Sequence, residues 1–338
     1  MKLFTTLITI LILSSCVGGP SYKGPVSDYY DGENFHYKNQ KINKSFSDLL
    51  KWKFSGKRQQ WPEEIKVNPV KIKEQRVNKG VVLTFINHST FLIQIDGVNI
   101  LTDPVWSRRV SPFSWVGPQR TRLPGVKYED LPPIDIVLIG HNHYDHLDID
   151  TLKKLGRDHE PRFIVGLGVD LLLKDNGLKN ITSLGWRESV TFSNIEYHFV
   201  ECQHWSARGL FDRNKTLWGS FIIKNHSKNI YFASDTGYSQ HFKEQQEVYG
   251  PMDISLLPIG AYEPRWFMKS QHMNPEEAVK SHIDLKSKFS IGMHFGTFQL
   301  TDEAIDTPIK ELKLALEKYK IDHKSFIAPE FGQQFRIE

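Results

Sequence analysis

Residues 134–148 read IDIVLIGHNHYDHLD, an apolar run followed at once by three histidines and two aspartates. The apolar part has the length and continuity of a buried strand, so the polar part begins where that strand ends. His141 and His143 are two residues apart and project to the same side, where they can share one cation. Asp145 and His146 follow after the chain has turned, and their different direction suits a second cation. The spacing H-x-H-x-D-H therefore predicts ligands for two adjacent metal ions.

Three later residues of ligand type close apolar, strand-like stretches: His204 follows YHFVECQ, Asp235 follows NIYFAS, and His294 follows FSIGM. A carboxylate such as Asp235 can bridge two metal ions. Imidazoles combined with carboxylates suit Zn²⁺, and the lack of thiolates in the pattern argues against a closed structural zinc site. Each residue alone also fits a surface polar residue where a strand meets a loop. All seven in this order favour a metal centre.

The body of the chain, from Val81 onward, alternates strand and helix signals without a repeat or a low-complexity break, which indicates one domain. VVLTFINHSTFLIQIDGVNILTDP predicts two or three strands with a turn at Asp96-Gly97, and SVTFSNIEYHFVEC predicts two strands joined at Ser193-Asn194. Helices are expected at NPEEAVKSHI, capped by Asn274, and at TPIKELKLALEKY. This mixture predicts an α/β fold with two mixed sheets and helices outside them, and not a doubly wound parallel sheet.

The N-terminal stretch MKLFTTLITILILSSCVGGP predicts an export signal that is not part of the fold. Its apolar run is too short to span a bilayer and ends in LSSC. This order resembles a bacterial lipoprotein signal, with residues 1–15 removed and Cys16 lipidated. The alternative is an ordinary secretory signal with an incidental cysteine. Val17 follows the cysteine, so in a Gram-negative host we expect a cell-envelope protein on the periplasmic side of the outer membrane.

Cysteine content and charge exclude some classes of protein. The only other cysteine, Cys202, cannot pair with a lipidated Cys16, so no disulfide framework is expected. A mature chain of more than 300 residues buries enough apolar surface without one. The formal net charge is only +4, which argues against a nucleic-acid-binding protein.

Two further segments are expected before the main domain. Residues 16–40 include the stretch VGGPSYKGPVSD and are expected to form a tether and linker. Residues 41–80 carry eleven Lys and Arg against four Asp and Glu, interleaved with aromatic residues. Such a segment suits the interface of an anionic membrane. The alternative is a solvated segment whose aromatic side chains pack on the main domain, residues 81–338.

The combined motifs resemble the metallo-β-lactamase fold and, within it, the N-acylphosphatidylethanolamine-hydrolysing phospholipase D family. The stretches HNHYDHLD, QHW, SDTG and GMHFGTF carry the likeness to the fold. Stretches without any ligand narrow it to the family: LTDPVWSRRVSP, GPQRTR, LWGS and, above all, LPIGAYEPRWFMKSQHMNPEEAV. The resemblance covers roughly residues 28–336.

The resemblance implies an αβ/βα sandwich that holds two Zn²⁺ ions with a bridging hydroxide. It implies the following ligands: His141, His143 and His204 for one zinc ion, Asp145, His146 and His294 for the other, and Asp235 between them. Asp103, in LTDP, matches a carboxylate that orients a metal-binding histidine; its alternative is an Asp-Pro turn. The family's GHAT-like turn is replaced here by NHST, which keeps His88 but not the glycine, so the shape of that loop is in doubt.

The expected substrate contacts are weaker inferences. Gln271 and His272 precede a predicted helix N-terminus, which favours anions, and suit phosphate oxygens; a capping role is the alternative. Tyr144 sits inside the metal-binding stretch and is expected to line the substrate groove. Arg208 is expected to contact substrate or to form a structural ion pair, and the latter is favoured for Arg265.

The implied activity is hydrolysis of the phosphodiester of N-acylphosphatidylethanolamine, or of a related phospholipid, to phosphatidic acid and N-acylethanolamine. Asp145 and Asp235 are expected to be catalytic through the metals they hold, because two cations can share a hydroxide and bind the phosphodiester. The expected partners are the phospholipid and a membrane surface. Two alternatives stay open: the same centre acting on a lactone or soluble phosphodiester, and a non-catalytic binding lipoprotein. The complete ligand set argues against the second.

Overall fold

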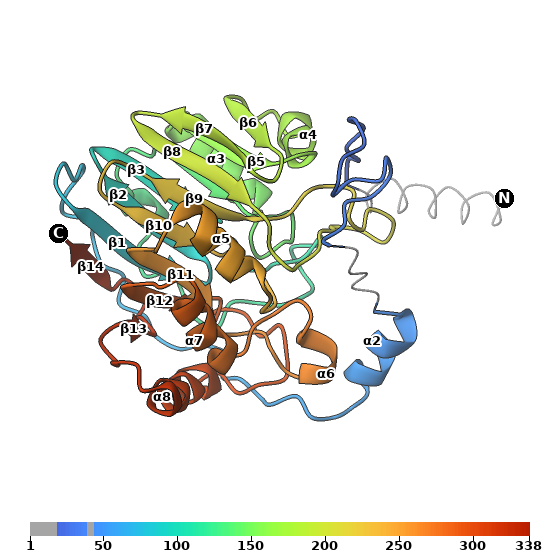
Figure 1. Ribbon diagram of the computed structural model, residues 1–338. Coiled ribbons are helices and arrows are strands. Elements are labelled where there is room, and N and C mark those ends of the chain that lie inside the picture. The colour runs from blue at the N-terminus through green and yellow to red at the C-terminus, as the bar shows by residue number, and fades with distance from the viewer. Residues whose placement is uncertain (1–18, 39–43) are drawn as a thin grey trace.

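The computed structural model describes residues 19–38 and 44–338. The expected signal peptide and Cys16 lie outside the described residues. Two seven-stranded sheets face each other with helices outside them, as Figure 1 shows. The predicted α/β sandwich with two mixed sheets is therefore confirmed.

The first sheet is antiparallel from β14 to β3 and parallel from β3 to β6. Its strands, in spatial order, are β14 (Gln334–Ile337), β1 (Val81–Asn87), β2 (Thr90–Ile95), β3 (Val98–Thr102), β4 (Ile136–Ile139), β5 (Arg162–Gly166) and β6 (Ile181–Leu184). The C-terminal strand pairs with β1, so the two ends of the main domain meet in one sheet.

The second sheet is parallel from β13 to β10 and antiparallel from β10 to β7. Its strands, in spatial order, are β13 (Phe326–Ile327), β12 (Phe289–Met293), β11 (Ile254–Pro258), β10 (Asn229–Phe232), β9 (Ser220–Lys224), β8 (Ile195–Val200) and β7 (Glu188–Phe192). Apolar side chains from both sheets form the main core, which explains the near-continuous apolar runs of the central strands.

Helices cover the outer faces of both sheets. A second apolar cluster joins β4 and β5 to α3 (Ile149–Asp158) and α4 (Val169–Asp175). The other sheet carries α5 (His241–Tyr249), α7 (Pro275–Asp284) and α8 (Thr307–Tyr319), whose apolar residues join the main core. The short elements are α2 (Phe46–Lys53), η1 (Tyr128–Asp130) and α6 (Arg265–Met268). None of the helices described is long and apolar enough to cross a membrane.

The predicted turns and the predicted helix cap are present, and the residues at these positions explain them. Asp96-Gly97 and Ser193-Asn194 join their strands with positive φ at all four residues, which Gly and Asn tolerate best. Asn274 caps α7, and Glu277 completes a capping box.

Several aromatic side chains of the segment before β1 are packed on the main domain, although most of its described residues are exposed. Tyr30, Phe35 and Tyr37, within the expected linker, are buried in the main core. Trp52 of α2 is 8% exposed, and its ring centroid lies 5.0 Å from that of Phe267 in α6. The linker interpretation of residues 16–40 therefore fails for Tyr30, Phe35 and Tyr37, because composition does not reveal the apolar surface that receives them. Trp52 belongs to residues 41–80, and its side chain follows the alternative in which aromatic residues of that segment pack on the main domain.

Candidate metal centre

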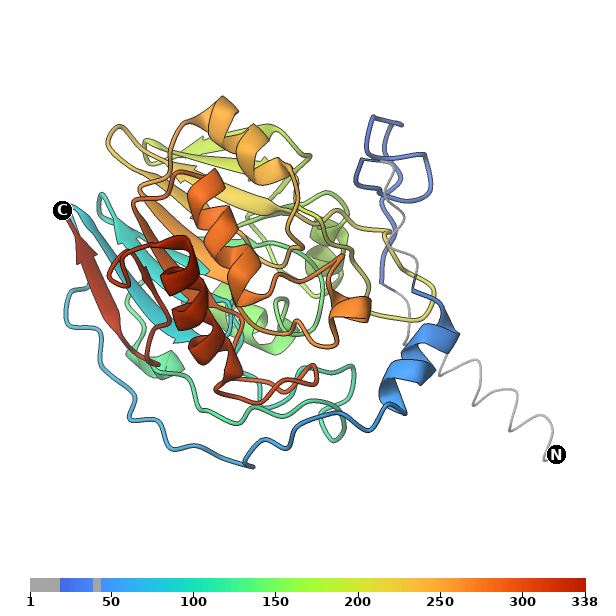
Figure 2. The same ribbon diagram turned by 60° about the horizontal axis from the view of Figure 1, so that its bottom comes forward.

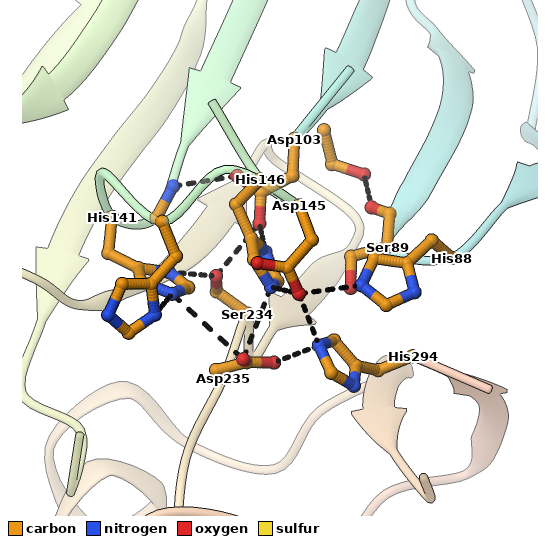
Figure 3. Close-up of polar contacts among 12 residues, drawn as sticks. His88, Ser89, Asp103, His141, Asp145, His146, Ser234, Asp235 and His294 are labelled. Atoms are coloured by element: carbon orange, nitrogen blue, oxygen red, sulfur yellow. Dashed lines mark hydrogen bonds and ion pairs between the residues drawn. The ribbon is translucent and has the colours of Figure 1, made fainter. Parts of the chain in front are cut away.

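The seven predicted ligands lie at one end of the sandwich, where the chain leaves four strands. His141, His143, Asp145 and His146 follow β4, and the other three, His204, Asp235 and His294, follow β8, β10 and β12. Figure 3 shows most of these side chains converging on one point. The loops after β4 and β10 touch at the base of this site. A Cβ on Gly140 would lie 2.1 Å from Ser234 Oγ, so only glycine fits at position 140.

Three imidazoles form the first cluster. His141 Nε2 lies 2.8 Å from His143 Nδ1, and His204 Nε2 lies 3.3 Å from the same nitrogen. Asp235 joins this group, with all four ligand atoms within 4.8 Å of one another. His204 Nδ1 faces the Gln271 carbonyl at 2.9 Å, so a proton on Nδ1 leaves Nε2 available to a cation.

The second cluster contains Asp145, His146 and His294. Asp145 Oδ2 lies 3.3 Å from His146 Nε2 and 3.2 Å from His294 Nε2. His88 is a fourth member, because its Nε2 lies 3.0 Å from the same oxygen. His88 has φ of 46° in the turn between β1 and β2, and its carbonyl accepts the His294 backbone N–H at 2.8 Å. The sequence keeps this histidine in NHST, but nothing in its spacing places it against Asp145.

Asp235 lies between the two clusters (Figure 3). Its Oδ1 is 3.1 Å from His294 Nε2, and its Oδ2 is 3.2 Å from His146 Nε2. The same Oδ2 lies 3.8 Å from His204 Nε2. One carboxylate thus faces both clusters, which is the position that a bridging ligand requires.

Asp103 orients His146 from the side opposite the clusters. Its Oδ2 lies 2.6 Å from His146 Nδ1 and accepts the Ser234 hydroxyl at 2.8 Å, and its Oδ1 accepts the Gly140 N–H at 2.8 Å. The carboxylate is fully buried. With His146 Nδ1 engaged in this way, Nε2 points into the second cluster.

The electrostatics suit cation binding. Burial lowers the pKa of His143 and of His204 to about 3, so both imidazoles are neutral and offer lone pairs. Burial by itself raises the pKa of the Asp235 carboxyl, but the surrounding imidazoles, His146 foremost, hold that pKa well below its ordinary value. The carboxylate is therefore ionised.

The hydrogen bonding of the buried ligand atoms also fits the binding of metal ions. The buried atoms His146 Nε2 and Asp235 Oδ1 lie 3.1–3.2 Å from other predicted ligand atoms, but in a geometry that makes no hydrogen bond within the part of the chain that the structure describes. Buried acceptors of this kind are costly unless something binds them, and a divalent cation also neutralises the two buried carboxylates. The donor set of imidazoles and carboxylates, without thiolate, suits a catalytic rather than a structural site.

A cavity of about 450 Å³ opens onto both clusters. Its polar lining, here called the polar wall, comprises His143, Asp145, Asp235, Gln271 and His272. The rest, here called the apolar wall, is mostly apolar and includes the cations Lys44 and Arg213; its apolar residues are Leu49, Trp52, Trp205, Ala261, Phe267, Met268 and Leu300.

The expected substrate residues divide into two groups. Gln271 and His272 line this cavity, and His272 Nδ1 lies 3.8 Å from Asp235 Oδ2. Tyr144 and Arg208 line a different, polar cavity instead. Arg208 Nη1 donates to the Asn142 and Leu147 carbonyls at 2.9 Å each, so this guanidinium braces the metal-binding loop.

Arg265 has the structural role that we favoured for it. Its Nη2 lies 2.6 Å from Glu277 Oε2, and its Nη1 donates to the His272 carbonyl at 2.9 Å. The guanidinium therefore ties α6 to the capping box of α7 and holds the backbone of His272, which itself faces the cavity.

Comparisons with known proteins agree with this site. Residues 98–295 match the family model described as a beta-lactamase superfamily domain. The N-acyl-phosphatidylethanolamine-hydrolyzing phospholipase D 1 of Caenorhabditis elegans is 39% identical over 269 residues, which cover 75% of each chain. The chain belongs to this phospholipase D family of the metallo-β-lactamase fold. The mitochondrial enzyme of the same name from Saccharomyces cerevisiae is 35% identical over 78% of this chain and 58% of its own length.

A solved structure gives independent support for the fold. A metallo hydrolase from the archaeon Ignicoccus hospitalis matches with a TM-score of 0.58 and 23% identity, over 77% of this chain and 99% of that chain. The family and the His and Asp clusters together identify a metal-dependent hydrolase.

Proposed function

We propose that this hydrolase holds two zinc ions and cleaves the phosphodiester of N-acylphosphatidylethanolamine, releasing phosphatidic acid and N-acylethanolamine. The observation that carries the proposal is one cavity with two unlike parts to its lining, a polar wall at the two ligand clusters and an apolar wall that adjoins it. A substrate with a charged phosphodiester and long acyl chains matches both walls. When bound, two adjacent cations lower the pKa of water and neutralise phosphate charge.

The residues of the polar wall have distinct tasks in this proposal. Asp235 faces both clusters and sets the spacing of the cations. His272 is buried, and burial lowers its pKa to about 3, so it meets the substrate as a neutral imidazole. Its Nδ1 has no hydrogen-bond partner among the described residues, which leaves it free to contact a phosphate oxygen.

The apolar wall suits an acyl chain. Leu49 and Trp52 come from α2, and Phe267 and Met268 come from α6. Apolar area buried against such a wall contributes about 25 cal/mol per Å², so a long chain adds substantial binding energy that a small soluble ester lacks. Lys44, at the same wall, suits the negative charge of the phosphodiester.

We also propose that Cys16 anchors the mature protein to a cell-envelope membrane, in a Gram-negative host the periplasmic side of the outer membrane. The supporting feature is the order of the first twenty residues, a short apolar run that ends in LSSC. An anchored enzyme takes its lipid from the bilayer, and the cations of α2, Lys51 and Lys53, suit an anionic surface.

Hydrolysis of lipid in mixed micelles tests the proposal. We expect zinc-loaded protein to release phosphatidic acid from N-acylphosphatidylethanolamine, and His272→Ala to lower kcat/KM by about 100-fold, the scale of a lost polar contact in the transition state. The exposed His226→Ala serves as the matched control and should keep full activity. Turnover of lactones or soluble phosphodiesters without phosphatidic acid from the N-acylated lipid would assign the centre to those substrates instead.

A further inference from the structure

The loop between β8 and β9 carries two exposed apolar side chains near its middle. Leu210 and Phe211, here called the apolar tip, are 78% and 80% exposed. Their loop lies beside the N-terminal segment of residues 19–38, whose Tyr22 and Phe35 N–H groups donate to the Lys215 and Asn214 carbonyls (Figure 1). Large adjacent apolar side chains on such a tip gain free energy only when something covers them. Neither residue lines a cavity described above, so the substrate site does not explain them.

The base of this loop is fixed to the metal centre. Asp212 accepts the backbone N–H groups of Arg208 and Gly209 at 3.0 and 2.8 Å. The Arg208 guanidinium lies 3.8 Å from the centroid of the Tyr144 ring and bonds two carbonyls of the metal-binding loop. The Tyr144 hydroxyl donates back to the Arg208 carbonyl at 3.0 Å. The apolar tip is therefore held at a defined position relative to the ligands.

Asp212 also accepts a hydrogen bond from the first described residue, Gly19. The Gly19 backbone N–H donates to Asp212 Oδ2 at 2.9 Å. Cys16 is three residues earlier in the sequence, and three residues span at most about 11 Å of chain. A lipid anchor on Cys16 would thus leave the protein close to the apolar tip.

The neighbouring surface has the charge and side chains of a membrane interface. Phe54 is 84% exposed at the end of α2, and Trp266 of α6 is 46% exposed. Lys51 Nζ lies 5.1 Å from the centroid of the Trp266 ring. Both views place α2, α6 and the loop after β8 on the side of the molecule away from the C-terminus (Figures 1 and 2). Cations beside exposed aromatic side chains favour an anionic lipid surface.

We propose that Leu210 and Phe211 insert into an anionic lipid surface and set the depth and orientation of the metal centre at that surface. The consequence for catalysis rests on the proposed function, because it is a lipid substrate that gains from the placement. The cavity lining includes Lys44 just before α2, Leu49 of α2, and Arg213 two residues after Phe211 in the same loop, so docking of the tip brings this part of the cavity to the headgroups.

Insertion is measured without any hydrolysis. The intact protein with Phe211→Cys is labelled with an environment-sensitive fluorophore and mixed with phosphatidylcholine–phosphatidylglycerol vesicles that carry brominated acyl chains. All proteins in this experiment carry Cys16→Ser, which removes the N-terminal thiol. Cys202 is buried and burial raises its pKa, so it does not compete for label, and the protein without an added cysteine measures the background. Val248→Cys, at a 74% exposed position on α5, is the matched control.

The proposal predicts that the brominated lipid quenches the label at position 211 and not the label at position 248. Equal exposure to water at both positions overturns it. A label at position 211 that is shielded before lipid is added also overturns it, because the tip would then be covered by protein, such as a second copy of the chain.

A second measurement covers the case of a labelled variant that does not fold. The double variant Leu210→Ser/Phe211→Ser should hydrolyse lipid in anionic vesicles about tenfold more slowly, because two apolar side chains no longer partition into the interface. Its rate on a monomeric short-chain N-acylated lipid should stay unchanged. Unchanged rates on vesicles, or equal losses on both substrates, contradict docking by this tip. If the unsubstituted protein hydrolyses neither lipid, the proposed function fails, and the quenching result alone decides the docking.

Discussion

The carboxylate of Asp103 lies 2.6 Å from His146 Nδ1 and is itself held by the Gly140 N–H and the Ser234 hydroxyl. Both Gly140 and Ser234 belong to segments that carry predicted metal ligands, since one precedes His141 and the other precedes Asp235. A single buried carboxylate therefore fixes the ring of one ligand and joins the loops that carry two others.

Asp103→Ala should lower metal affinity and hydrolysis by about 10- to 100-fold, because His146 loses the partner that fixes its tautomer and orientation. Metal content after dialysis and kcat/KM measure the effect. Asp175→Asn, at an exposed carboxylate at the end of α4, is the control and should change neither quantity. Full metal content and activity in Asp103→Ala would show that the contact has no role in positioning.

Asp235→Asn should weaken both metal sites, whereas Asp145→Asn should weaken only the second. The reason is that Asp235 faces both clusters and Asp145 faces one. Titration of zinc against a chromophoric chelator gives the two affinities in each variant. Equal behaviour of the two variants would argue against Asp235 as the bridge.

Metal removal should lower the melting temperature strongly. The centre gathers buried carboxylates and imidazoles from four strand ends, and without cations their charges are balanced only by protons. A ligand at a thousand times its Kd stabilises the native state by about 4 kcal/mol, so a chelator removes stabilisation of that order. Scanning calorimetry with chelator, and after zinc is restored, measures it. An unchanged melting temperature would mean that no metal binds the folded chain.

Glu303→Ala should destabilise the fold by about 3 kcal/mol, because its buried carboxylate accepts three consecutive backbone N–H groups. Oε1 accepts the N–H of Ala261 at 2.6 Å and that of Tyr262 at 3.3 Å, and Oε2 accepts that of Glu263 at 3.1 Å. Urea unfolding compares this variant with Glu317→Ala, an exposed glutamate of α8. If Glu303→Ala lowers the free energy of unfolding no more than Glu317→Ala does, the Glu303 carboxylate does not stabilise the backbone of residues 261–263 as proposed.

Trp52→Ala should change acyl-chain selectivity, because Trp52 lines the apolar wall of the cavity. Trp61→Ala is the matched control. The Trp52 indole N–H donates to Asp302 Oδ1 and the Trp61 indole N–H donates to the Glu303 carbonyl, at 2.9 Å each, so both tie the N-terminal segment to the same loop. Trp61, however, does not line the cavity. We expect Trp52→Ala to lower the ratio of rates for longer over shorter N-acyl chains, because it removes apolar area that a longer chain would cover, and Trp61→Ala to leave the ratio unchanged. Parallel shifts in both variants would assign the effect to the segment rather than to the wall.

The sequence predicts the ligand loop well because the end of a buried strand fixes where its next residues lie. His141, His143 and the later strand ends all follow this rule. It could not place His88, whose contact with Asp145 spans 57 residues and depends on the packing of the β1–β2 turn. It also misplaced Tyr144, since spacing in an irregular loop does not give the direction of a side chain, and this ring lies at the other cavity against Arg208.

The direct test of the central claim is hydrolysis in water labelled with heavy oxygen, with N-acylphosphatidylethanolamine in mixed micelles and zinc-loaded protein. If water attacks phosphorus at this centre, the label appears in phosphatidic acid and not in the released N-acylethanolamine. Label in the N-acylethanolamine, or no phosphatidic acid at all while other esters are cleaved, would contradict the proposed reaction.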